Sequence, residues 1–142
     1  MKRNIFFTTL IFLTSFSASA QLVPNNKIYL EFLKTTEEVN VDGSDAVEML
    51  HSYIRDKTTL NIIASKEDAE YILTLSVVEK NMGKRKGRIL ISENASGKVI
   101  FDTEWQKANS TAFYGYSGTR AVIGKMVKQF ILKSYPLIAV DD

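Results

Sequence analysis

Residues 69–80, AEYILTLSVVEK, decide the fold. One alternating set in this stretch is uniformly large and apolar, and it comprises Tyr71, Leu73, Leu75 and Val77. The other set mixes apolar and hydroxyl side chains, and it comprises Ile72, Thr74, Ser76 and Val78. This period-two pattern is typical of a β-strand with one buried face and one partly covered face. The stretch therefore predicts a two-layer α/β domain.

The segments around this strand complete the prediction. Alternating apolar residues predict further strands over 28–33, 60–64, 88–93 and 99–106, and apolar residues at helical spacing predict helices over 46–57 and 119–135. We expect Asp45 and Thr119 to cap the two helices. The element order β-α-β-β-β-β-α then gives one mixed sheet of about five strands, with the third to fifth strands as a meander and both helices on one face. The expected core comprises Leu30, Phe32, Leu50, Ile54, Leu73, Leu75, Val77, Phe101, Trp105, Val127 and Phe130.

The first twenty residues have the pattern of a secretory signal peptide. Lys2 and Arg3 precede an apolar run that is too short to span a bilayer, and Ala18-Ser19-Ala20 ends in small residues. We expect cleavage between Ala20 and Gln21, with export of a soluble protein to the periplasm or the extracellular space. Residues 21–26 are then a lead-in, 27–138 a single domain and 139–142 a frayed tail, with no transmembrane segment after cleavage.

Charge and cysteine content exclude several classes of protein. The chain has 18 basic and 16 acidic residues, and loss of Lys2 and Arg3 with the signal peptide leaves the two kinds equal in number. A neutral mature chain lacks the general electrostatic attraction that nucleic-acid binding requires, so we expect no nucleic-acid partner. The chain has no cysteine, which excludes disulfides, thiolate metal sites, cysteine nucleophiles and a lipid-bearing cysteine.

The pattern as a whole resembles a known class of domain. A strand, a helix, a short strand, then DAEYIL at 68–73 entering a long strand and SGKVI at 96–100 in a hairpin turn are similar to the small periplasmic α/β domains of bacterial envelope proteins. The families it resembles are the TolB amino-terminal domain and the curli-secretion lipoproteins. The resemblance covers residues 27–135, and it implies an envelope-protein partner.

A loop rich in aromatic residues is the first candidate binding site. Residues 111–119, TAFYGYSGT, combine aromatic side chains with glycines and hydroxyls, a composition typical of recognition loops. We expect Phe113, Tyr114 and Tyr116 to contact a partner. The alternative is that these rings fold back over the edge of the core.

A cluster of basic residues is the second candidate. Residues 83–88, GKRKGR, place Lys84, Arg85, Lys86 and Arg88 close together in the chain, where they could contact an anionic lipid surface. The alternative is a solvated hairpin tip, in a turn predicted over 81–87, that protects the end of the sheet from aggregation.

No set of residues indicates catalysis. His51 is the only histidine and has no second ligand or catalytic partner in sequence, and Asp102 and Glu104 form a carboxylate pair without a nearby nucleophile. We therefore expect no enzyme, no catalytic residue, no metal and no cofactor. The preferred function is an exported, non-catalytic accessory or interaction module of the cell envelope. The alternative is a small-ligand or anionic-lipid-surface binder that uses the sheet face bearing Thr74 and Ser76, and a hydrolase is the least favoured class.

Overall fold

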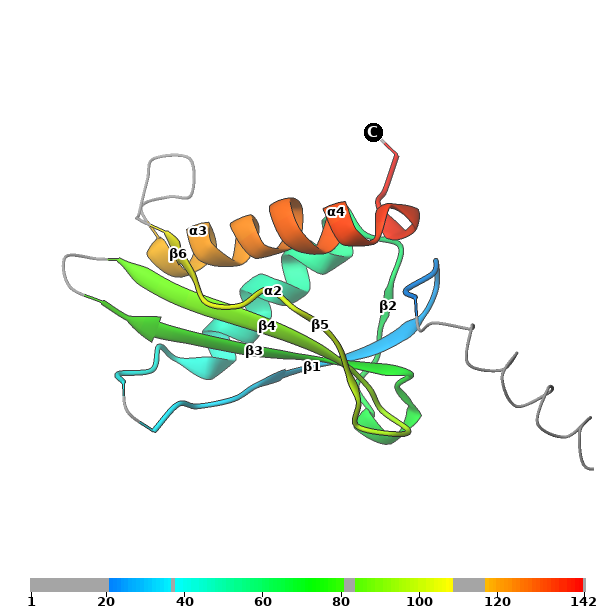
Figure 1. Cartoon of the computed structure of the whole chain (residues 1–142), viewed down its shortest axis with the longest axis horizontal. Helices are drawn as coiled ribbons and strands as arrows, with labels where there is room; N and C mark the ends of the chain where they lie inside the picture. Colours follow the sequence, from blue (N-terminus) through cyan, green and yellow to red (C-terminus); the bar gives the residue numbers. More distant parts are fainter. Residues whose placement is uncertain (1–20, 37, 81–83, 109–116, 142) are drawn as a thin grey trace, which may run out of the picture.

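The computed structural model describes residues 21–36, 38–80, 84–108 and 117–141 (Figure 1). Its strands are β1 (Lys27–Phe32), β2 (Asn61–Ile62), β3 (Tyr71–Glu79), β4 (Arg85–Glu93), β5 (Val99–Asp102) and β6 (Gln106–Ala108). Its helices are α2 (Gly43–Lys57), α3 (Gly118–Lys125), the π-helical segment η4 (Met126–Ile131) and α4 (Leu132–Ser134), with 3-10 turns η1 (Lys66–Asp68) and η5 (Pro136–Ile138). In the part of the chain so described, no helix has the length and apolar character needed to cross a membrane.

The sheet is mixed, as predicted, with strand order β2-β1-β3-β4-β5 and β6 paired with β4. β1 runs parallel to both β2 and β3, whereas β3, β4 and β5 form an antiparallel meander. The register places Leu75 of β3 between Phe32 of β1 and Ile89 of β4. The stretch that decides the fold is therefore the strand on which the parallel and antiparallel halves of the sheet meet.

Both helical segments cover the same face of the sheet (Figure 1). α2 begins after Asp42, whose Oδ1 accepts the backbone N–H of Asp45 at 3.0 Å. α3 begins after Ser117, whose Oγ accepts the backbone N–H of Arg120 at 3.1 Å. The predicted caps, Asp45 and Thr119, are wrong because each lies inside the first turn of its helix, behind another residue that is equally able to cap.

The core lies between this face and the helices. Of the predicted core residues, seven are buried: Leu30, Leu50, Ile54, Leu73, Leu75, Val77 and Val127. Phe32 and Phe101 are partly buried against the same cluster, and Phe130 is half-buried outside it. Gly87 lies where the helical layer comes nearest the sheet, since a Cβ atom there would be 2.9 Å from Cε of Met126. This contact explains why a glycine predicted to be in a turn lies inside β4.

The last predicted strand is the main departure from the predicted fold. The segment 99–106 divides into β5 and β6, which pair with different parts of β4. Trp105, predicted to be in the core, lies on the other face of the sheet, among the residues described below. In the tail, Ala139 forms a bridge with Thr58 and the N–H of Val140 donates to the carbonyl of Lys57, and the expected fraying stays a prediction.

Candidate functional site

The sheet face opposite the helices carries a groove with a volume of about 420 Å³. Its floor comes from β3 and β4, one wall from the loop after β1, and the opposite wall from Trp105. The lining residues are Leu33, Lys34, Thr35, Thr36, Glu38, Thr74, Ser76, Lys86, Arg88, Leu90 and Trp105. The floor residues belong to the alternate set of each strand, the one that does not enter the core, so the predicted half-covered face is where the groove forms.

Asn40 holds the loop wall in place. Its Oδ1 accepts the backbone N–H of Thr35 at 2.9 Å, and its Nδ2 donates to the carbonyl of Thr35 at 2.9 Å. Asn40 also forms an antiparallel bridge with Val78 of β3. At the start of the loop the N–H of Leu33 donates to the carbonyl of Leu75 at 2.8 Å. Hydrogen bonds at both ends therefore keep the wall beside the floor.

Two hydroxyl groups lie on the floor. Ser76 Oγ donates to the carbonyl of Leu33 at 2.8 Å, and Thr74 Oγ1 donates to Oε1 of Glu31 at 3.3 Å. A hydroxyl that donates one hydrogen bond can still accept others through its lone pairs. Both oxygens thus anchor the surrounding structure and keep the capacity to accept from a bound group.

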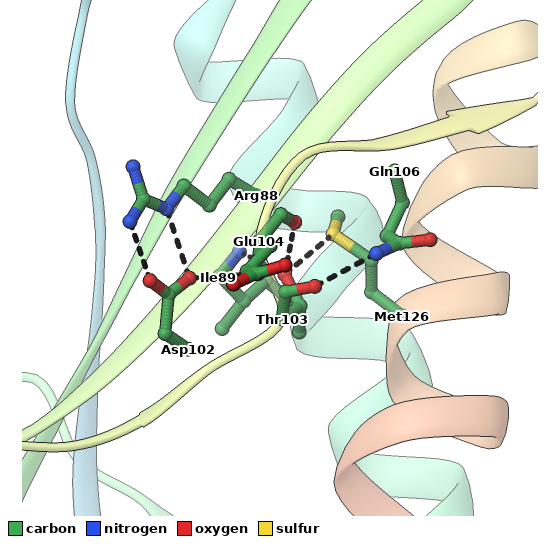
Figure 2. Close-up of polar contacts among 7 residues, drawn as sticks. All are labelled: Arg88, Ile89, Asp102, Thr103, Glu104, Gln106 and Met126. Atoms are coloured by element: carbon green, nitrogen blue, oxygen red, sulfur yellow. Dashed lines mark hydrogen bonds and ion pairs between the residues drawn. The ribbon is translucent and has the colours of Figure 1, made fainter.

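A left-handed turn at Glu104, drawn in Figure 2, precedes Trp105, which lines the groove. Glu104 has φ = 57°, a conformation that side-chain-bearing residues seldom adopt. Its N–H donates to Oδ1 of Asp102 at 2.7 Å, and Thr103 Oγ1 lies 2.9 Å from the Glu104 carbonyl. The turn adds one residue to the alternation, so Thr103 faces the helices while Trp105 faces away from them.

Thr103 ties this turn to the neighbouring strand (Figure 2). Its Oγ1 accepts the backbone N–H of Ile89 at 2.9 Å, and its carbonyl accepts Nε2 of Gln106 at 2.7 Å. Its hydroxyl also lies 3.5 Å from Sδ of Met126 in the helical layer. Thr103 itself is buried, so its bonds are shielded from water. The position of Trp105 is therefore set by a network rather than by the strand alone.

Arg88 and Asp102 form a bidentate pair beside the floor. Nε of Arg88 donates to Oδ1 of Asp102 at 2.8 Å, and Nη2 donates to Oδ2. The hydrogen bond from Arg88 lowers the pKa of Asp102, and the same bond raises the pKa of Arg88. Figure 2 shows the third guanidinium nitrogen directed away from Asp102. One edge of Arg88 is thus left for another acceptor.

Glu38 and Lys86 are two further charged residues of the lining. Nζ of Lys80 donates to Oε1 of Glu38 at 2.7 Å, whereas Nζ of Lys86 lies 3.7 Å from the same oxygen. The hydrogen bond from Lys80 lowers the pKa of Glu38. Nζ of Lys86 also lies 4.8 Å from the centre of the Trp105 ring, within the range of a cation–π contact. Lys86 therefore links the loop wall to the tryptophan wall.

The predicted site residues are divided by the structure. Lys86 and Arg88 line the groove. Arg85 belongs to the other set of β4 side chains, which faces the helices, and its Nη2 lies 3.6 Å from Oε1 of Glu79. Lys84 is exposed and directly precedes the first residue of β4. Phe113, Tyr114 and Tyr116 lie outside the described residues, so their role stays a prediction.

Sequence reasoning missed three parts of the groove, namely Trp105, Glu38 and the loop from Leu33 to Thr36. The alternation of residues 99–105 assigned Trp105 to the core, and no residue type in that stretch marks the turn that reverses it. The sequence signal for the loop is Leu33, an apolar residue outside the alternating set Ile28, Leu30 and Phe32, and the structure leaves it 55% exposed. The prediction that Thr74 and Ser76 share a partly covered face identified the floor.

No family model and no curated protein matches this chain. Among solved structures it is similar to PelC from Paraburkholderia phytofirmans, a dodecamer, with a TM-score of 0.54 and 17% identity over 86% of this chain and 94% of PelC. A variant of that protein gives a TM-score of 0.53, 18% identity and coverage of 85% and 94%. The chain shares the PelC fold.

A further similarity is to the C-terminal domain of LpoB from Salmonella enterica, with a TM-score of 0.48 and 8% identity over 68% of this chain and 91% of that domain. At 17% and 18% identity, the similarity to PelC shows the fold alone. The expected relationship to the TolB amino-terminal domain and the curli-secretion family stays a prediction.

Proposed function

We propose that this protein is an exported, non-catalytic binding module of the cell envelope whose ligand lies on the open face of the sheet. The observation that carries the proposal is the groove, into which the network around Thr103 directs Trp105. Its volume of about 420 Å³ lies within the range of small-molecule sites. Hydrogen bonds within the chain hold both walls, as expected of a preformed site.

The charges at the groove support binding over catalysis. A general acid needs a carboxyl group with a raised pKa, but hydrogen bonds from cations lower the pKa of Glu38 and of Asp102. Glu104 lies on the left-handed turn after β5, outside the strand that carries Asp102. In the described ranges, no three His, Cys, Asp or Glu side chains gather as a metal site would require.

The pattern of residues 1–20 supports export. Mass spectrometry of the protein purified from its native source should find Gln21 at the amino terminus. An intact Met1 would contradict this part of the proposal.

The groove itself can be tested by NMR with the mature protein and fractionated envelope extract. Trp105 is the only tryptophan, so its indole N–H gives a single resonance, and the amides of Thr74 and Ser76 report on the floor. A binding fraction should shift these three signals together. Perturbation confined to the helical layer, or no perturbation by any fraction, would contradict the proposal.

A matched pair of variants gives the control. Leu33 and Val99 are 55% and 50% exposed, and only Leu33 lines the groove. Leu33→Asp should abolish the shifts, whereas Val99→Asp should leave them unchanged.

A further inference from the structure

We propose that the groove takes an anionic amphiphile, with a carboxylate or phosphate group at Lys86 and an apolar chain against Leu33, Leu90 and Trp105. This inference deepens the proposed function and rests on it, because it names the class of ligand for the same groove. Three features of the groove support it: the balance of charge, the availability of the cations, and the apolar surface beside them.

The charge balance of the lining favours an anion. Lys34, Lys86 and Arg88 line the groove, and Glu38 is the one carboxylate among the described lining residues. Glu38 is already bonded by Lys80 at 2.7 Å, so its charge is largely compensated from outside the groove. A bound cation would meet Lys34 and Lys86 without an unpaired carboxylate. A bound anion would gain from these two cations and from the edge of Arg88 that its pair with Asp102 leaves open.

Two of these cations keep donors for a ligand. Nζ of Lys86 forms an ion pair with Oε1 of Glu38 at 3.7 Å, a distance too long for a hydrogen bond, so its N–H groups remain able to donate to a ligand. Arg88 uses Nε and Nη2 for Asp102, and its third nitrogen is directed away from that pair (Figure 2). A guanidinium has five N–H donors, so the bidentate pair leaves several unused.

The apolar part of the lining indicates more than a simple anion. Leu33 is 55% exposed, and it stands on the wall opposite Trp105 with Leu90 on the floor. Burial of apolar surface stabilises a complex in proportion to the area removed from water. A ligand with a hydrocarbon chain would use these three side chains, whereas inorganic phosphate would use none of them.

Trp105 emission and calorimetry can test the ligand class on the mature protein. The probe is dodecyl phosphate below its critical micelle concentration, compared with inorganic phosphate and with uncharged dodecyl maltoside. We expect saturable binding of dodecyl phosphate at least about tenfold tighter than either comparison compound, because a charge-assisted hydrogen bond contributes this much or more. Equal binding of dodecyl maltoside or of inorganic phosphate would overturn the proposal.

Variants can test whether Lys86 binds the head group of the ligand. Lys86→Met should weaken dodecyl phosphate binding about tenfold, and Lys98→Met, which removes an exposed cation outside the groove, should leave it unchanged. Equal affinity of wild type and Lys86→Met would overturn the assignment.

Vesicles distinguish the two sources of such a ligand. Saturable binding of free monomer with no affinity for phosphatidylglycerol vesicles identifies a single extracted amphiphile. Lys86-dependent binding to phosphatidylglycerol vesicles but not to phosphatidylcholine vesicles identifies the head groups of a bilayer, and either result supports the inference. If envelope fractions shift the groove resonances but the active component is uncharged, this inference fails while the proposed function stands.

Discussion

Nζ of Lys86 lies 4.8 Å from the centre of the Trp105 ring, so a cation on β4 covers the aromatic side chain that follows the left-handed turn. A cation–π contact at a partly exposed site contributes about 0.5–1 kcal/mol. Lys86→Met keeps most of the aliphatic stem and removes the charge. We expect it to lower the free energy of unfolding by about that amount and to shift the emission of Trp105. Unchanged emission would show that the ammonium does not contact the ring in solution.

Thr103→Val should be destabilising despite its nearly equal volume. The N–H of Ile89 donates to the Thr103 hydroxyl at 2.9 Å, and valine would leave this buried donor without that acceptor. The expected loss is about 1–3 kcal/mol in urea unfolding. Thr103→Ser retains the hydroxyl and is the matched control. A smaller loss for valine than for serine would mean that packing of the methyl group, and not the hydrogen bond, holds the turn.

Asp102→Asn should have a pH-dependent effect. Arg88 lowers the pKa of Asp102 in the folded protein, so the folded state binds fewer protons than the unfolded state near the usual carboxyl pKa of about 4. The stabilisation is therefore full above that pH and is lost as the pH falls through the lower folded pKa. Because both side chains are about a third exposed, we expect no more than about 1 kcal/mol.

Urea unfolding of wild type and Asp102→Asn between pH 7 and pH 2 would measure this difference. Asparagine retains an oxygen for the N–H of Glu104, so the variant isolates the charge. A penalty that stays constant across this range would contradict the electrostatic explanation.

Leu75→Ala tests the central strand. Leu75 is fully buried between Phe32 and Ile89, and a large-to-small change at such a site costs about 2–5 kcal/mol. Leu33→Ala removes the same atoms from a residue that is 55% exposed, so its effect should stay within about 0.5 kcal/mol. Similar midpoints for the two variants in denaturant unfolding would place Leu75 outside the core.

Much of the fold could be predicted from period alone. The alternation in residues 69–80 predicts β3 and its buried face, and the apolar spacing in 46–57 predicts α2, because burial of one face imposes the pattern directly on the sequence. The caps could not be separated, since Asp42 and Asp45 have the same side chain within one helical turn. Gly87 was assigned to a turn, because no local signal reveals that Met126 approaches β4 at that point.

Part of the candidate site could also be predicted from the alternation of side chains along a strand. Thr74 and Ser76 indicated the exposed floor, since hydroxyls alternate with large apolar residues in β3. Trp105 and Glu38 reach the groove through the turn at Glu104 and the loop closed by Asn40, and both depend on hydrogen bonds between residues that local patterns do not pair. Hydrogen bonds between residues that local patterns do not pair produce no periodic pattern of residue types in the sequence.

Because of the turn at Glu104, the function of this edge of the sheet depends on the number of residues between β5 and β6. β5 and β6 pair with one continuous β4, so the single added residue between them decides the side of the sheet on which every later side chain of the segment emerges. Deletion of one residue at this point would move each later side chain of the segment to the opposite face of the sheet, although no side chain would be replaced. An aromatic side chain would enter the protein interior, and the groove would lose a wall. At this position an insertion or a deletion is thus a more severe genetic change than most substitutions.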